Sequence, residues 1–174
     1  FNSFHLACKH NMKFIIMFLL KNKLIQGTEL TSNGDSPIHI AIKFNSVDVI
    51  KYLITILPSN LLLVTNNQGF TPLHLAALEG NLQSLQLLVS IPDVDLSVGD
   101  SKEGKTCLHL ACLNHHYNII KYLVQDKKVN IHQGDNNGIT AAQIHNDDIV
   151  INYLINGTIP QSNIHNNNNN NNNN

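Results

Sequence analysis

The sequence predicts an all-α solenoid, in which helix-turn-helix units stack one behind another and β-turn fingers project from one edge. Three observations support this prediction. One phrase with a central histidine returns every 34 or 35 residues, an apolar helical phrase follows each copy, and clusters of Gly, Asn and Asp separate the copies. A fixed period of this length is the signature of repeat architectures, whose units bury each other's faces.

The first helix of each unit is predicted by the histidine phrase. Aligned on their glycines, four copies read GDSPIHIAIKFN from Gly34, GFTPLHLAALEG from Gly69, GKTCLHLACLNH from Gly104 and GITAAQIH from Gly138. The opening NSFHLACKHN fits the same frame without its glycine. The histidines of this frame therefore recur at intervals of 34, 35 and 35 residues, as His5, His39, His74 and His109.

Local capping rules explain why this phrase forms a helix. Thr71 can cap the helix through its hydroxyl, and Pro72 stands at the first helical position, where a missing N–H costs nothing. Gly80 can take the left-handed conformation that ends the helix. In the following unit, Thr106 keeps the cap while Cys107 replaces the proline.

Two other units depart from the phrase. Ser36 replaces the capping threonine in the second unit, and Gln143 stands where the fifth unit would carry histidine. The fifth unit is also shorter by three residues between its cap, Thr140, and its second helix. We expect this unit to be a terminal cap of the stack.

The second helix of each unit is predicted by apolar residues at i, i+1, i+4 and i+5, which form a broad helical stripe. This stripe occurs at 14–20, 48–54, 84–89, 118–124 and 149–155. Helices of about nine residues are marginal alone, because nucleation is costly. Each helix pair must therefore be stabilised by its neighbours.

The segments between the units predict tight turns. They read LTSNGD, TNNQGF, GDSKEGK and GDNNGI, and these residue types suit positive φ. The segments SIPDVDLSV and DKKVNIHQ, which we call arms, precede the last two turns. The arm at 55–65 is more apolar, through residues 61–64, and is expected to thicken the packing between the second and third units.

The phrase TPLHLA at 71–76, with a helix pair every 34 or 35 residues, resembles the ankyrin repeat. The resemblance extends from residue 1 to about residue 157. It implies an ankyrin repeat domain at 1–160, with units at about 1–33, 34–68, 69–103, 104–137 and 138–157. The remaining residues, 161–174, end in nine consecutive Asn and are expected to form a disordered tail.

The composition argues against nucleic acid and membrane partners. The 11 basic residues, all Lys, are balanced by 12 acidic ones, so no basic field is available for nucleic acid. The longest apolar run, 14–20, is far shorter than the roughly 20 residues of a membrane span, so no membrane insertion is expected. Three cysteines without a disulfide framework favour an intracellular, cytoplasmic location. Because Phe1 is not an initiator Met, we expect the chain to be an excerpt of a longer one.

The frame histidines are interpreted as structural. Each stands two residues beyond the proline position, where an imidazole can bridge the capping hydroxyl and the backbone of a neighbouring unit. The predicted structural set comprises His5, His39, Thr71, Pro72, His74, Gly80, Thr106 and His109.

Two alternatives would give the histidines a chemical role. His109, Cys112 and His116 would share one helix face as a zinc-like set, but a turn before His116 would break the helix and the spacing fits no standard zinc pattern. Ser36 and His39 suggest a serine hydrolase, but one short helix leaves no place for the third group of a triad. No enzyme activity, metal or cofactor is therefore predicted.

The resemblance implies a module that binds another protein, with no small-molecule substrate. In the ankyrin family the finger tips and the concave face of the first helices carry the contact residues. The positions so implied are Asp35, Lys43, Phe44, Asn67, Gln68, Phe70, Leu78, Glu79, Lys102, Glu103, Lys105, Leu113, Asn114 and Ile139.

Four of these positions are apolar and are expected to be exposed anchors of binding: Phe44, Phe70, Leu78 and Leu113. The alternative is that one or two of them pack between fingers. A competing interpretation of the whole chain is a regulatory or targeting segment of a larger enzyme or channel, whose catalytic part lies outside these residues.

Overall fold

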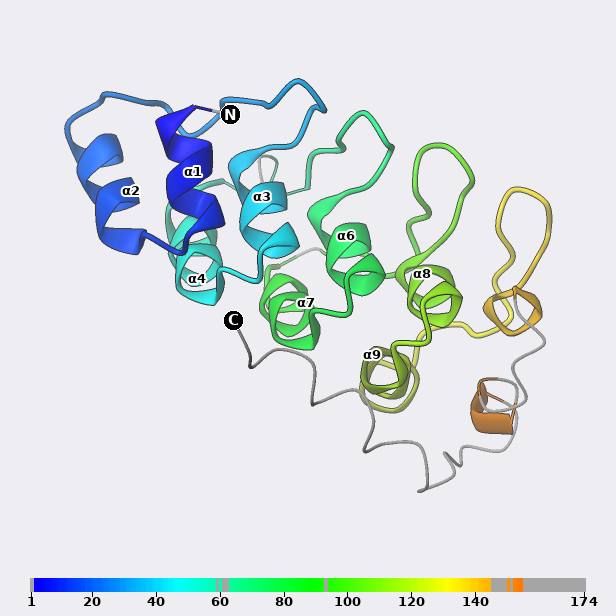
Figure 1. Ribbon diagram of the computed structural model, residues 1–174. Helices are drawn as coiled ribbons and strands as arrows, with labels where there is room; N and C mark the ends of the chain where they lie inside the picture. The colour runs from blue at the N-terminus through cyan, green and yellow to red at the C-terminus, as the bar shows by residue number, and fades with distance from the viewer. Residues whose placement is uncertain are drawn as a thin grey trace, which may run out of the picture.

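A computed structural model describes residues 2–58, 60, 63–92, 94–144, 150 and 152–154. Four helix pairs follow one another along the chain (Figure 1). They are α1 (Ser3–Lys9) with α2 (Lys13–Lys21), α3 (Pro37–Lys43) with α4 (Val47–Ile56), α6 (Pro72–Leu78) with α7 (Leu82–Val89), and α8 (Cys107–Leu113) with α9 (Tyr117–Lys121). Helix α9 continues as a π-helical turn, Tyr122–Asp126. A 3-10 turn, Ala141–Gln143, begins the fifth unit.

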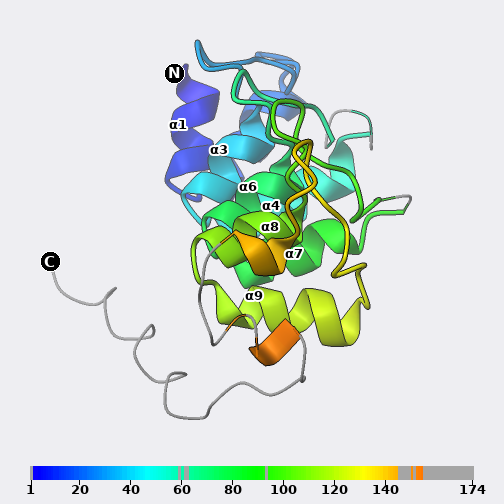
Figure 2. The same ribbon diagram turned by 90° about the vertical axis from the view of Figure 1, so that its right-hand side faces the viewer.

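The pairs form two layers of helices. In the first layer α1 packs on α3, α3 on α6 and α6 on α8, while in the second layer α2 packs on α4 and α4 on α7. Figure 2 looks along the stack and shows the finger loops gathered above the helices. Within the described residues the only β pairing outside helices is one isolated bridge, between Gly134 and Thr140. The predicted all-α solenoid with projecting fingers is confirmed.

The core lies between the units. Its centre is lined by alanines that recur in the first helices, and Ala41, Ala76 and Ala111 are all fully buried. Because alanine is small, the first helices can approach closely, and the larger side chains of the second helices fill the remaining space. The second-helix residues that are fully buried include Ile50, Leu53, Leu85, Leu88 and Leu123.

A left-handed residue separates the two helices of every pair. These residues have φ between 51° and 76°, and they are Asn11, Asn45, Gly80 and His115. Gly80 is required for a second reason, since a Cβ there would lie 2.6 Å from Cε1 of His116. The helix therefore ends at the same place in each unit, and the second helix starts at a fixed angle to the first.

Parts of the sequence prediction fall outside the described residues. The predicted helix at 149–155 is described only at residue 150 and at 152–154, and the tail at 161–174 is not described. In the arm at 55–65, Leu63 and Val64 are half-buried, whereas residues 61 and 62 are not described. The predicted helix at 118–124 is observed, but it changes from α to π geometry after Lys121.

We expect Leu123→Ala to lower the free energy of unfolding by about 2–5 kcal/mol, because a fully buried leucine leaves a cavity when it is truncated. Urea denaturation measures this. The control Gln125→Ala, at an exposed position in the same turn, should change the unfolding free energy by about 0.5 kcal/mol or less. Equal effects of the two substitutions would contradict the placement of this helix against the core.

Candidate functional site

The histidine of the third unit bridges two parts of the chain. Nδ1 of His74 lies 3.3 Å from the backbone N of Thr71 and 2.8 Å from its hydroxyl, while Nε2 lies 3.0 Å from the carbonyl oxygen of Val98. A backbone N–H can only donate and a carbonyl can only accept. Nδ1 is therefore the acceptor, and Nε2 carries the proton of a neutral imidazole.

The same arrangement recurs along the stack. Nδ1 of His39 accepts from the backbone of Ser36 at 3.2 Å, and its Nε2 lies 3.0 Å from the carbonyl of Phe70. Nδ1 of His109 accepts from the backbone of Thr106 at 3.2 Å, and its Nε2 lies 3.0 Å from the carbonyl of Ile139. The carbonyls bound by His39 and His109 belong to the following unit, whereas the one bound by His74 belongs to its own unit. The first two bonds therefore link one unit to the next.

The first and fifth units vary this pattern. Nδ1 of His5 accepts from the backbone N–H of Asn2 at 3.2 Å, and Nε2 lies 3.1 Å from the carbonyl of Glu29. In the fifth unit, Oε1 of Gln143 accepts from the backbone N–H of Thr140 at 2.9 Å and from its hydroxyl at 3.1 Å. The glutamine oxygen thus takes the place of Nδ1 at the helix cap.

Burial keeps these imidazoles neutral. It is the largest effect on His39, His74 and His109, and it lowers the pKa of each below its ordinary value. The hydrogen bond to the carbonyl and a nearby aspartate raise each pKa in part. The neutral state matches the hydrogen bonds, because a protonated Nδ1 could not accept from the cap.

The serine-hydrolase alternative is contradicted by this geometry. The hydroxyl of Ser36 lies 2.7 Å from Nδ1 of His39, but Ser36 is only 5% exposed and His39 is fully buried. Nε2 of His39 is bound to the carbonyl of Phe70 rather than to an orienting carboxylate. A substrate could not reach this hydroxyl, so the pair serves as a helix cap.

The zinc-like set is also separated by other interactions. His116 lies beyond the left-handed turn at His115, and its Nε2 bonds to the carbonyl of Leu78 at 2.9 Å. In the part of the chain that the structure describes, no group of three His, Cys, Asp or Glu side chains is placed to hold a metal ion. The three cysteines are buried and form no disulfide, and burial raises the pKa of Cys8 and Cys107 to about 12, which keeps these thiols protonated.

A second set of bonds between units was not predicted from the sequence. In the second, third and fourth units, the residue just before the second helix forms a side-chain hydrogen bond to the first helix of the preceding unit. Ser46 Oγ donates to the carbonyl of Lys9 at 3.2 Å, and Asn81 Nδ2 donates to the carbonyl of Ile42 at 2.7 Å. His116 occupies the same position. The signal in the sequence was a polar residue immediately after the left-handed residue of each of the three later pairs.

The fingers are joined to one another through their backbones. The N–H groups of Asn67, Ser101 and Asn136 donate to carbonyls of the preceding finger at 3.0, 3.1 and 2.9 Å. Within one finger, Oδ1 of Asp100 accepts from the N–H groups of Lys102 and Glu103 at 2.9 and 2.8 Å. The finger tips are therefore held in a fixed register.

The finger-tip residues expected to contact a partner are at the surface. Asn67, Gln68, Lys102 and Glu103 are exposed, and Lys105 is half-buried and paired with Glu103. Asn67 is also structural, since its side-chain amide donates to the carbonyl of Ser32 at 3.2 Å. These tips combine both signs of charge with amide groups.

The ends of the first helices add a second row. Lys43, Phe44, Glu79 and Asn114 are exposed at these ends, and Ile139, in the last finger, is 39% exposed. Phe44 is 41% exposed, and the ammonium group of Lys9 lies 4.8 Å from the centre of its ring. This row therefore presents an aromatic ring in contact with a cation.

Two expectations about the contact residues are wrong. Asp35 is only 6% exposed and accepts a hydrogen bond from Asn66 at 2.7 Å, so it joins two fingers internally. Phe70, Leu78 and Leu113 are half-buried, and Phe70 and Leu78 pack against the core. Among the four expected anchors, Phe44 alone is exposed.

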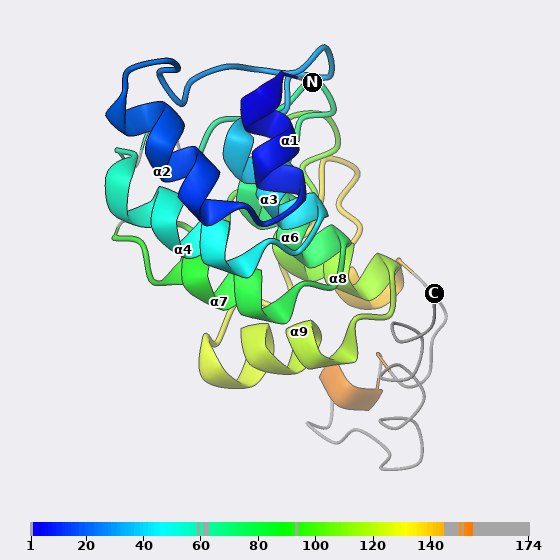
Figure 3. The same cartoon turned by 60° about the vertical axis from the view of Figure 1, so that its left-hand side comes forward.

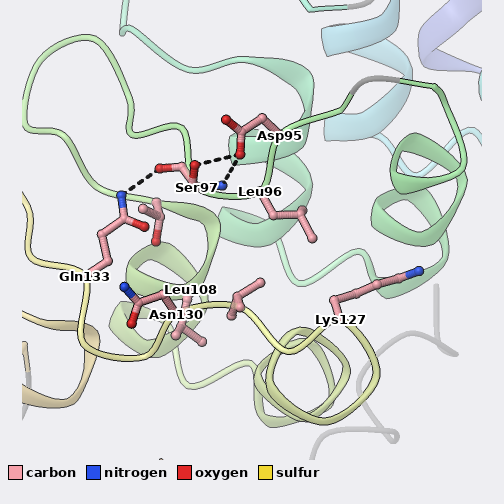
Figure 4. A pocket seen from close by; sticks show the side chains of 9 residues that line it. Asp95, Leu96, Ser97, Leu108, Lys127, Asn130 and Gln133 are labelled. Atoms are coloured by element: carbon pink, nitrogen blue, oxygen red, sulfur yellow. Dashed lines mark hydrogen bonds between the residues drawn. The ribbon is translucent and has the colours of Figure 1, made fainter.

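A small cavity lies between the arms of the third and fourth units (Figure 4). Its volume is about 200 Å³, below the roughly 300 Å³ at which ligand pockets begin. Asp95 accepts from the backbone and hydroxyl of Ser97 at 2.8 and 2.6 Å, and Gln133 donates to the carbonyl of Ser97 at 2.7 Å. These polar groups satisfy one another, so the cavity is interpreted as a seam between arms.

Comparison with known proteins agrees with this geometry. A family model described as ankyrin repeats (many copies) matches residues 4–54, and one described as ankyrin repeats (3 copies) matches residues 55–137. The chain belongs to the ankyrin repeat family. Domains of this family are generally protein–protein interaction modules and are typically not catalytic. A search of curated proteins found no match. Among the described helices, none is long and apolar enough to cross a membrane.

We expect the free energy of unfolding to be constant above a pH of about 6.5, the ordinary histidine pKa, and to fall at lower pH. The folded pKa values of His39, His74 and His109 are lowered, so the unfolded chain binds more protons in this range. His74→Gln should lower the free energy of unfolding by about 1 kcal/mol at pH 7. Gln can cap the helix as Gln143 does, but it cannot replace both the bond to Thr71 and the bond to Val98.

Urea denaturation between pH 8 and pH 5 measures this dependence. The difference in unfolding free energy between the wild type and His74→Gln should become smaller as the pH falls. The wild type loses stability when His74 is protonated, whereas the variant has no histidine at this position. The exposed His132 provides a matched control, and His132→Gln should follow the wild type throughout. Parallel curves for the wild type and His74→Gln would contradict a neutral, buried His74.

Proposed function

We propose that the domain binds another protein through its finger tips and the adjoining ends of its first helices. The observation that carries this proposal is the backbone ladder that links the fingers, together with the exposed row beside it. A surface that is already ordered loses little conformational entropy on binding. The fold of the family supports the same mode, since its members generally bind proteins.

The proposed contact surface consists of Lys43, Phe44, Asn67, Gln68, Glu79, Lys102, Glu103, Asn114 and Ile139. Lysines and glutamates lie along it in comparable number, so it suits a partner with a mixed charge pattern. The whole chain has no Arg and a net charge of -1, which favours a protein over nucleic acid. The three buried cysteines, which form no disulfide, support an intracellular location.

Phe44 is the proposed centre of this surface. Its ring is exposed, lies beside the lysine of the preceding unit and has polar residues around it. Aromatic side chains in such a setting are frequent hot spots of binding. Phe70 is a poorer probe, because it is half-buried against the core and its truncation would disturb folding as well.

We expect Phe44→Ala to weaken binding of a captured partner by about 2 kcal/mol, which is about thirtyfold in affinity. The matched control is Phe18→Ala, which removes a ring that is 61% exposed on α2, away from the fingers. Both substitutions should change the free energy of unfolding by about 0.5 kcal/mol or less.

The measurement is affinity capture from cell extract, followed by titration of the captured protein against each variant. A partner whose affinity is lowered equally by both substitutions, or by Phe18→Ala alone, would contradict the proposed surface. If the partner's affinity is unchanged by Phe44→Ala but lowered by charge reversal at Lys102, the centre of binding lies at the fingers and not at Phe44.

A further inference from the structure

We propose that the outer surface of α1 and α2 is a stacking face, covered by a further helix pair that the same polypeptide supplies before residue 1. Figure 3 shows α1 and α2 at the open end of the stack, with no described helix in front of them. This face lies at the end of the solenoid rather than on the finger tips, so the inference is independent of the proposed function.

Equivalent positions in later units show what this face lacks. Ile15 is 46% exposed, whereas its equivalents Val49, Ser84 and Ile119 are at most 1% exposed. These equivalents are covered by the turn of the preceding unit, and the backbone N–H of Val49 donates to Oδ1 of Asn11 at 3.2 Å. In the first unit, no described residue covers Ile15 in this way.

The first helix shows the same contrast. Leu6 is 47% exposed, whereas its equivalents Ile40, Leu75 and Leu110 are at most 4% exposed. The later first helices are covered at this position because each packs on the helix before it. The exposed side chains on α1 and α2 therefore continue the interface that already joins the other units.

The apolar surface extends further around α2 than stacking alone requires. Phe14 is 82% exposed and Met17 is 37% exposed. Later units place polar residues at these two positions, for example Asp48 and Lys51. A terminal unit of a solenoid needs a polar outer surface, and α2 does not have one. The covering segment must therefore reach around α2 as well as stack on it.

The charge of the first unit argues against a second copy as the cover. Residues 2–33 contain four lysines, Lys9, Lys13, Lys21 and Lys23, against one acidic residue, Glu29. Two copies facing each other about a twofold axis would bring together two units that each have this excess of positive charge, which opposes association. A segment with an apolar stripe and acidic edges suits the face better. Met12, Phe14 and Ile15 line an open hollow into which a side chain of that segment can insert.

The test compares two chains that both carry Ile15→Cys. One begins at residue 1, and the other also contains the roughly 35 residues, one repeat, that precede it in the natural polypeptide. The three natural cysteines are buried, so the new thiol dominates labelling. The extension should slow labelling of this thiol about tenfold or more, because the site then reacts only through local opening.

Lys51→Cys is the matched control, at an exposed position on the second helix of the next unit, and the extension should leave its labelling rate unchanged. A second measurement covers the case in which the cysteine variant folds poorly. Ile15→Asp should leave the urea midpoint of the shorter chain nearly unchanged and lower that of the extended chain clearly.

Several results would overturn the proposal. Equal labelling of Ile15→Cys in both chains would show that the extension does not cover the face, and a natural polypeptide that starts at Phe1 would remove its source. Concentration-dependent dimerisation that Ile15→Asp abolishes would assign the face to a second copy. Binding of the extended chain to vesicles of phosphatidylserine and phosphatidylcholine, lost in Phe14→Asp, would assign it to a membrane surface.

Discussion

The structure depends on the contact between successive units, because none of the helices that the structure describes is long enough to be stable alone. The regular helices of the four pairs span between 5 and 10 residues. Helices of this length are marginal in water, so most of their stability comes from burial against a neighbour. Every first helix consequently needs a well-defined start, a well-defined end and a partner on each side.

The frame histidines meet two of these needs with one side chain. Nδ1 completes the cap of the helix, and Nε2–H reaches a carbonyl of an arm or of the following unit. Serine or threonine can cap a helix but cannot reach both groups, and lysine has no acceptor. The imidazole performs this role only when neutral, which is why its burial among apolar residues is compatible with the fold. In the fifth unit Gln143 forms only the cap, because its Oε1 accepts from the N–H of Thr140.

Much of this architecture could be predicted from the sequence. The 34- and 35-residue intervals placed the helix pairs, and the Thr71 cap and the Gly80 terminus followed from local rules that the structure obeys. Less predictable was which side of a short helix faces solvent. Phe70 and Leu78 pack against the core and Leu113 is half-buried, and exposure at such positions depends on tertiary contacts that the local pattern does not contain. Asp35 was misplaced for a related reason, since its partner Asn66 lies 31 residues away.

The links that the frame histidines form require neutral imidazoles that accept at Nδ1 and donate from Nε2. Nitrogen-15 spectra of the histidine side chains at pH 7 test this most directly, because the two ring nitrogens have different shifts in each tautomer and in the protonated form. We expect the neutral Nε2–H tautomer for His39, His74 and His109. Signals of the Nδ1–H tautomer or of an imidazolium at these three positions would contradict it.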